Sequence, residues 1–321
     1  MTKNKNLVTN LKSLTYLPSV SGNEAVVVGY LKDKLKDSQI SFSSDAKNNL
    51  ICKKGHHPEK LALIAHMDKE GFIVVSVEKD NLKVVGTHKL EVFTKGPISK
   101  VLCSDKSGKT DLGLLVNAGE GINILKVTVK DPKKYTIGDF VCYSSNFITN
   151  NNIVQAPYLD NSMGVSVAIE VLKEIKEGTV IFTSLEEVGF QGVGPAIYSV
   201  KPEKAIVLDT TYDIESPNGT KLTAGKGPSI CIKDKVFGDK SIINELVSLA
   251  EENKIPYQLE VWEEANSDMN GFHAMFGGVK CCFVGLPIKN PKAINQIGSV
   301  KDMVWAQKLL VKYFKEIYSC L

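Results

Sequence analysis

Continuous apolar runs alternate along the chain with stretches in which apolar residues recur every three or four positions. The runs LALIAHMD at 61–68, TVIFTS at 179–184 and CCFVGLP at 281–287 are typical of strands that are buried on both faces of a sheet. MGVSVAIEVLKEI at 163–175 has the spacing of a helix with one buried face. This alternation predicts an α/β fold in which helices cover both faces of a mixed, largely parallel sheet.

The same criteria extend the α/β pattern over both ends of the chain. Near the N-terminus, Ser21-Gly22-Asn23-Glu24 has the form of a capping box that starts a helix in the following VVVGYLKDKLKD segment. Beyond residue 200, strands are predicted at 204–209 and 255–262, and helices at 241–253 and 304–317.

The middle of the chain has a different pattern. Short alternating or β-branched runs, among them FIVVSV, LKVVG, GLLVNAG, ILKVTV and DFVCYS, are separated by the turn-like stretches KDN, AGEG and DPKK. We therefore predict a β-rich, barrel-like domain at 68–156, inserted into an α/β domain that is built from 1–67 and 157–321.

Composition narrows the class of protein. The chain is 43% hydrophobic and 23% charged, and its net charge of +3 comes from scattered lysines, so we expect a globular protein that does not bind nucleic acid. No apolar run is long enough for a membrane span, and the N-terminus lacks the apolar segment of a signal peptide. Seven cysteines without regular spacing indicate free thiols in a reducing cytoplasm.

Acidic residues and one histidine gather at the ends of predicted strands. Six residues follow a strand or precede a helix: His66, Asp68, Asp160, Glu186, Glu187 and Asp209. Ligands of open α/β sheets bind outside the carboxyl ends of the strands, so we expect these side chains in one crevice. So many carboxylates cannot all ionise together without a counter-charge. One or two divalent metals would supply it, and mixed histidine and carboxylate ligands suit zinc, cobalt or manganese.

Each of these residues has a simpler explanation when it is considered alone. His66 could be a satisfied buried histidine, Asp160 could be an N-cap, and Glu186 and Glu187 could be solvated loop residues. Their shared position at strand ends favours the metal site. The remaining histidines lack this position and are interpreted as structural or surface residues: His56, His57, His88 and His273.

The motifs taken together resemble one family. AHMDKEGF, APYLDNSMG, SLEEVGFQG, VLDTTYD, GKGPSI and NSDMNGFHAMFGGV follow the order of the tetrahedral glutamyl and deblocking aminopeptidases over essentially the full chain. These proteins are dinuclear metallopeptidases, some of which are labelled endoglucanases. The resemblance implies a zinc-exopeptidase-like fold and the removal of N-terminal residues from peptides.

The resemblance also implies a role for each metal ligand. Asp160 would bridge two metal ions. His66 and Asp209 would complete the first site, and Glu187 would bind the second ion. Zinc is the expected metal, with cobalt and manganese as alternatives, at one or two ions per chain.

The remaining implied roles concern catalysis and assembly. Glu186 would be the general base that takes a proton from a metal-activated water, and Asp68 would orient His66. The inserted domain would be a dimerisation domain, with dimers assembling into a dodecameric tetrahedral shell.

One position departs from the family pattern. An alignment without gaps between Gly285 and Asp302 places Lys292 where the family has the histidine of its second metal site. Three alternatives remain open. In the first, the second site is weak, and Asp160, Glu187 and water hold a loosely bound ion. In the second, the Lys292 ammonium replaces the metal near Glu187. In the third, Lys292 points to solvent.

The leading hypothesis is therefore a metal-dependent aminopeptidase with Glu186 as its general base. Lys292 motivates the alternative, a catalytically weak or inactive homologue with a structural or peptide-binding role. A glycosidase with Glu186 and Glu187 as its acid/base pair is disfavoured. Glycosidase carboxylates flank the scissile bond at about 5–9.5 Å, whereas adjacent residues at one strand end face different ways.

Overall fold

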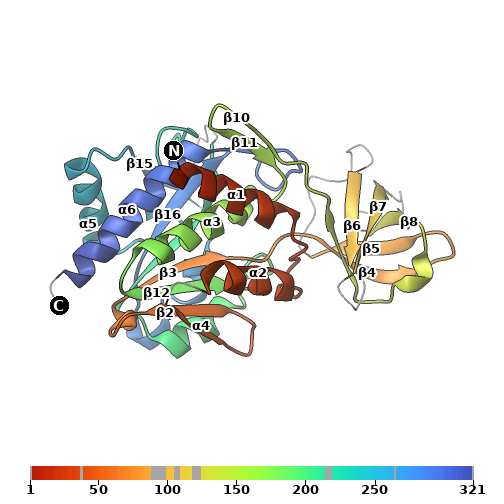
Figure 1. The fold of residues 1–321 in the computed structure, drawn as a ribbon, viewed down its shortest axis with the longest axis horizontal. Coiled ribbons are helices and arrows are strands. Elements are labelled where there is room, and N and C mark those ends of the chain that lie inside the picture. The colour runs from red at the N-terminus through yellow and green to blue at the C-terminus, as the bar shows by residue number, and fades with distance from the viewer. Residues whose placement is uncertain are drawn as a thin grey trace.

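The computed structural model describes residues 2–36, 39–87, 99–104, 109–117, 124–213, 219–263 and 265–319. It contains an α/β unit built from both ends of the chain and a β-barrel that projects to one side of that unit (Figure 1). His88 and the turn-like AGEG stretch at 118–121 lie outside the described residues.

An eight-stranded sheet forms the centre of the α/β unit, in the order β1-β2-β12-β3-β13-β16-β14-β15. The bounds of these strands are Ser41–Ser44 (β1), Leu50–Lys54 (β2), Leu61–His66 (β3), Gly178–Thr183 (β12), Lys204–Tyr212 (β13), Ser229–Lys233 (β14), Gln258–Val261 (β15) and Lys280–Ile288 (β16). Successive neighbours from β12 to β16 are parallel, as are β14 and β15. The β1–β2, β2–β12 and β14–β16 pairs are antiparallel. The sheet is therefore mixed and largely parallel, as predicted.

Helices cover both faces of this sheet. The α-helices of the described residues are Thr2–Tyr16 (α1), Ala25–Leu35 (α2), Leu159–Glu174 (α3), Val193–Val200 (α4), Lys240–Glu252 (α5) and Val300–Tyr318 (α6). One face packs against α1, α2, α3, α5 and α6, whereas α4 and the short helix Asp268–Gly271 (η4) cover the other. None of the helices in the described ranges is long and apolar enough to cross a bilayer.

The central strands are apolar throughout because both of their faces are buried. Leu61, Leu63 and Ala65 of β3 belong to the core that α1, α3 and α6 share. The alternate residues Ala62 and Ile64 belong to the core beside α4. Successive side chains of a strand point to opposite faces, so a strand between two helical layers requires an unbroken apolar run.

Six strands close into the barrel, in the order β4-β5-β8-β7-β6-β9. Their bounds are Phe72–Val77 (β4), Leu82–Gly86 (β5), Ser99–Ser104 (β6), Thr110–Asn117 (β7), Ile124–Val129 (β8) and Phe140–Tyr143 (β9). Val74, Val84, Val101 and Val127 fill the interior. The alternating pattern of the middle segment thus reflects strands with one buried face, and the predicted fold class is confirmed.

A three-stranded sheet joins the segment that follows the barrel strands to the segment that precedes α6. Ile148–Asn150 (β10), Ile153–Ala156 (β11) and Gln296–Ser299 (β17) pair in antiparallel fashion. Short 3-10 helices lie elsewhere at Pro58–Lys60 (η1), Pro132–Lys134 (η3) and Met275–Gly277 (η5). β11 directly precedes α3 and pairs with β17. The loop before β17, residues 289–295, is therefore held near the start of α3.

The predicted capping box at 21–24 is wrong. α2 begins at Ala25, and Glu24 makes no capping hydrogen bond through its side chain. The hydroxyl of Ser21 instead donates to Asp68 Oδ2 at 2.7 Å, and Glu24 Oε1 accepts from the N–H of Gly22. A partner distant in sequence has displaced the local contact that the motif predicts.

Leu63→Ala should test the contribution of the two-sided core. Leu63 is fully buried in β3, so its truncation should lower the free energy of unfolding by about 2–5 kcal/mol through lost burial and a cavity. Urea denaturation followed by circular dichroism measures the change. Leu259→Ala on β15, where the side chain is 45% exposed, is the control. Equal losses in the two variants would contradict this account.

Candidate active site

Strand register brings His66 and Asp209 to the same edge of the central sheet. β12 and β13 flank β3 as parallel neighbours, Thr183 pairs with His66, and Val207 pairs with Ile64. Continuation of the second register by two residues sets Asp209 beside His66. The carboxyl ends of β3, β12 and β13 therefore lie at one edge of the sheet, and the polar residues at these ends meet at that edge.

His66 Nε2 faces three carboxylates. It lies 3.4 Å from Asp160 Oδ1, 3.4 Å from Asp209 Oδ1 and 3.9 Å from Glu186 Oε2. Ligand atoms of His66, Asp160 and Asp209 lie within 4.8 Å of one another, and so do those of His66, Glu186 and Glu187. One imidazole nitrogen with two carboxylate oxygens, all buried or nearly so, fits a zinc-type divalent metal.

Asp160 enters the site from the first turn of α3, where its backbone departs from helical geometry. Its N–H donates to Gln296 Oε1 at 3.0 Å, and the neighbouring Asn161 donates through Nδ2 to the carbonyl of Leu208. These bonds tie the segment to β17 and β13. The Asp160 carboxylate faces His66 and does not cap α3.

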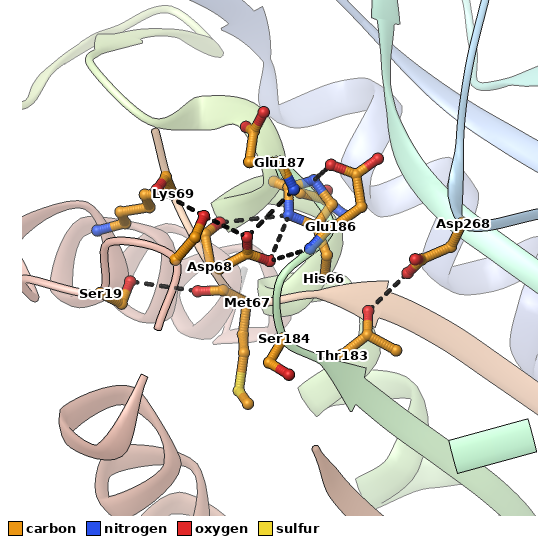
Figure 2. A network of polar contacts seen from close by, with 12 residues as sticks. Ser19, His66, Met67, Asp68, Lys69, Thr183, Ser184, Glu186, Glu187 and Asp268 are labelled. Carbon is orange, nitrogen blue, oxygen red and sulfur yellow. Dashed lines mark hydrogen bonds and ion pairs between the residues drawn. The ribbon is translucent and has the colours of Figure 1, made fainter. Parts of the chain in front are cut away.

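The Asp68 carboxylate holds the backbone of both adjacent glutamates (Figure 2). Its Oδ1 accepts from the N–H of Glu186 at 3.1 Å, and its Oδ2 accepts from the N–H of Glu187 at 3.2 Å and from the Ser21 hydroxyl. His66 Nδ1 lies 3.2 Å from the Asp68 carbonyl oxygen and 3.5 Å from Oδ1. Asp68 thus contacts the imidazole mainly through its backbone and positions the glutamates through its side chain.

Lys292 reaches the site from the loop between β16 and β17. Its Nζ lies 2.8 Å from Glu187 Oε2, 3.1 Å from Glu70 Oε1 and 3.2 Å from Asp160 Oδ2. This geometry contradicts the alternative in which Lys292 points to solvent. It places the ammonium at the carboxylates expected to hold the second metal.

Burial and charge compete in setting the acid–base properties of these groups. Burial raises the pKa of Glu186 well above its usual range, with Glu187 adding to the effect and His66 opposing it. Burial would also raise the pKa of Asp160, but Lys292 and His66 outweigh it and hold that pKa well below its ordinary value. Cations close to the carboxylates therefore decide which of them stay ionised.

A cavity of about 700 Å³ opens beside these residues. Glu186, Glu187 and Lys292 line it, together with the aromatic side chains of Tyr212 and Trp262. A narrow recess lined by His66, Asp160 and Asp209 adjoins it. The arrangement gives a small organic molecule access to the candidate metal position.

Two acidic residues near the site were not assigned from the sequence. Glu70 pairs with Lys292. Asp268 is buried, accepts from the Thr183 hydroxyl at 2.6 Å through Oδ2 (Figure 2), and has its pKa raised to about 7 by burial. Both lie in motifs noted in the sequence, AHMDKEGF and NSDMNGFHAMFGGV, but neither ends a predicted strand.

Comparisons with known proteins point to one family. The family model described as M42 glutamyl aminopeptidase matches residues 122–309. A protein from Acetivibrio thermocellus named "Putative aminopeptidase" is 29% identical over 325 residues, which cover 94% of this chain and 96% of that protein.

Solved structures show the same fold. Aminopeptidase APDkam598 from the archaeon Desulfurococcus kamchatkensis superposes with a TM-score of 0.89 at 21% identity, covering 98% of each chain. The TET1 peptidase of Pyrococcus horikoshii superposes with a TM-score of 0.82 at 23% identity, covering 96% of this chain and 98% of its own. That peptidase is described as able to assemble into a tetrahedron or a large octahedral shell.

Zinc should stabilise the metal-free protein through the candidate ligands. Binding to the folded state alone raises the melting temperature, and Asp209→Asn should remove most of this rise because a neutral amide is a poor zinc ligand. Differential scanning fluorimetry with and without zinc after chelator treatment measures the shift. Asp33→Asn, at a side chain that is 71% exposed, should respond like the wild type. An unchanged zinc response in Asp209→Asn would contradict the assignment.

Proposed function

Because the chain belongs to the M42 glutamyl aminopeptidase family and is a hydrolase that acts on peptides, we propose that it removes N-terminal residues from peptides in a metal-dependent reaction. The observation that carries the proposal is the convergence of His66, Asp160 and Asp209 on one point beside Glu186. This set joins metal ligands to a candidate proton carrier at the wall of an open cavity.

The first metal position belongs to three side chains. His66 would bind through Nε2, and Asp160 and Asp209 through their Oδ1 atoms, which face that nitrogen. Zinc is the metal that we expect, with cobalt or manganese as alternatives. A divalent metal here would polarise a peptide carbonyl and lower the pKa of a water molecule. Asp160 and Glu187 would be the carboxylates nearest a second position, which Lys292 makes degenerate.

Glu186 is the proposed general base. Its Oε2 lies 3.9 Å from His66 Nε2, farther than the 3.4 Å of Asp160 and Asp209, so the carboxylate would border the proposed metal position. From there it can take a proton from the attacking water and return it to the leaving amine. Asp68 supports this role as a positioning residue, because it accepts from the Glu186 N–H and lies next to the His66 ring.

The proposed assembly is a homo-oligomer in which dimers form a dodecameric tetrahedral shell. Residues 1–67 and 157–321 would be the catalytic domain, and the inserted 68–156 would be the dimerisation domain. Apolar side chains on the outside of this segment support the assignment, since Leu112 is 64% and Ile137 73% exposed in the single chain. The shell named for the Pyrococcus horikoshii peptidase supports it further.

The cytoplasm is the proposed location. The cysteines that the structure describes are free and buried, which suits a reducing compartment. We propose no nucleic-acid or membrane partner, in keeping with the small net charge.

The alternative is a weak or inactive homologue that binds peptides or serves a structural role. Lys292 is the observation that favours it, because its ammonium lies at the carboxylates that would hold a second metal. Hydrolysis of aminoacyl chromogenic substrates by the zinc-, cobalt- or manganese-loaded protein separates the two functions. Complete inactivity with every metal would favour the alternative.

Glu186→Gln should lower kcat by about 10²–10⁴-fold, because a neutral amide cannot accept the proton of the attacking water. Zinc binding, measured by isothermal titration calorimetry, should persist in this variant. Glu203→Gln, at an exposed position remote from the cavity, is the matched control and should retain full turnover. Undiminished hydrolysis by Glu186→Gln would remove this residue from the mechanism.

Sedimentation should test the assembly. We expect a mass near twelve times that of the 35.1 kDa chain in analytical ultracentrifugation. Leu112→Asp introduces a charge into an exposed apolar patch of the barrel, and it should shift the population toward smaller species because an unpaired charge at an interface is costly. A monomeric wild type would contradict the proposed shell.

A further inference from the structure

The ammonium of Lys292 lies close to three carboxylates. Its Nζ lies within 3.2 Å of one oxygen each from Glu187, Glu70 and Asp160. Nζ donates a hydrogen bond to Glu187 Oε2 and forms ion pairs with Glu70 and Asp160. The three acids come from segments that are distant in sequence and that surround the end of one side chain.

Asp160 divides its carboxylate between two cationic positions. Oδ1 lies 3.4 Å from His66 Nε2, at the proposed metal position, and Oδ2 lies 3.2 Å from Lys292 Nζ. A carboxylate that bridges two metal ions divides its oxygens in the same way. Lys292 therefore stands where the second of two bridged ions would stand.

The surroundings of Lys292 suit an ammonium better than a metal ion. The Nζ–oxygen distances of 2.8 to 3.2 Å are those of an ordinary ammonium–carboxylate ion pair. Within the described part of the chain, His66 is the one histidine that belongs to a candidate metal group. His66 faces the proposed first metal position. A second ion would therefore have to displace Lys292 Nζ and bind without an imidazole.

We propose that the Lys292 ammonium permanently replaces the second metal ion, so that each chain binds one divalent metal and carries one fixed organic cation. This inference rests on the proposed function for the existence of the first metal position. An ammonium can neutralise and orient Asp160 and Glu187 as a metal would. It cannot lower the pKa of a bound water as a metal does, so activation of the water depends on the first position alone.

Lys292 is also within reach of a bound substrate. Its side chain is 33% exposed and lines the cavity beside Glu186 and Glu187. An ammonium that exchanges one of its carboxylate contacts can donate to a carbonyl oxygen in the cavity. The residue therefore combines two tasks, neutralisation of the buried acids and recognition of the peptide carbonyl.

Metal content per chain tests the replacement directly. Wild type, Lys292→His and Lys289→His are treated with chelator, dialysed against zinc and analysed by inductively coupled plasma mass spectrometry. Lys289 is the matched control, since it is the first residue of the same loop and its side chain is 56% exposed. We expect one ion per chain in the wild type and in Lys289→His, and two in Lys292→His. Two ions in the wild type, or equal contents in wild type and Lys292→His, would overturn the proposal.

Stability without metal gives a second test that does not require a new metal site. Lys292→Met leaves three nearly buried carboxylates facing one another, so Tm in chelator should fall by roughly 5–10 °C. Added zinc should raise the Tm of this variant more than that of the wild type, because the acids then recruit a cation. Lys289→Met should behave as the wild type does. A wild-type Tm and zinc response in Lys292→Met would count against the replacement.

Neither readout uses a peptide, so the two proposals can fail separately. Absence of hydrolysis, combined with one ion in the wild type and two in Lys292→His, would reject the proposed function and support the replacement. Hydrolysis by a wild type that holds two ions would support the function and reject the replacement.

Discussion

Repulsion among buried or nearly buried carboxylates is the constraint on which this site depends. The ends of β3, β12 and β13 and the start of α3 deliver Asp160, Glu187 and Asp209 to one edge of the sheet. Ionised carboxylates at such distances stay together only beside cations. His66 marks the proposed metal position, Lys292 supplies an ammonium, and Asp160 turns one oxygen toward each. The acids and the cations therefore require one another.

The scaffold explains how flexible acidic side chains can be held in such an arrangement. The parallel register fixes the positions of His66 and Asp209. Hydrogen bonds that the Asp68 carboxylate accepts fix the backbone of Glu186 and Glu187. Elements on rigid strands place reactive groups more accurately than free loops do. The barrel lies to one side of the α/β unit (Figure 1). It supplies none of the described residues that line the cavity.

Sequence patterns predicted well those features that depend on a single segment. Two-sided burial requires an unbroken apolar run such as that of β3, and the polar residues that end such runs lie at one edge because parallel strands share a direction. The meeting of His66 and Asp209 follows from that rule, whereas Asp160 comes from the start of α3 and the chemical roles of all three remain predictions. The capping box at 21–24 failed because Ser21 found a stronger partner in Asp68, a residue 47 positions away.

The sequence by itself determined the fold class, the edge of the sheet at which acids gather and the presence of a lysine where the resemblance leads one to expect a histidine. Only the tertiary structure decided where the Lys292 ammonium lies. Its partners are Glu187, 105 positions away, together with Glu70 and Asp160. Periodicity reports which face of an element is buried. It does not report which charges from distant segments meet there, because that depends on how strands, helix and loop pack against one another.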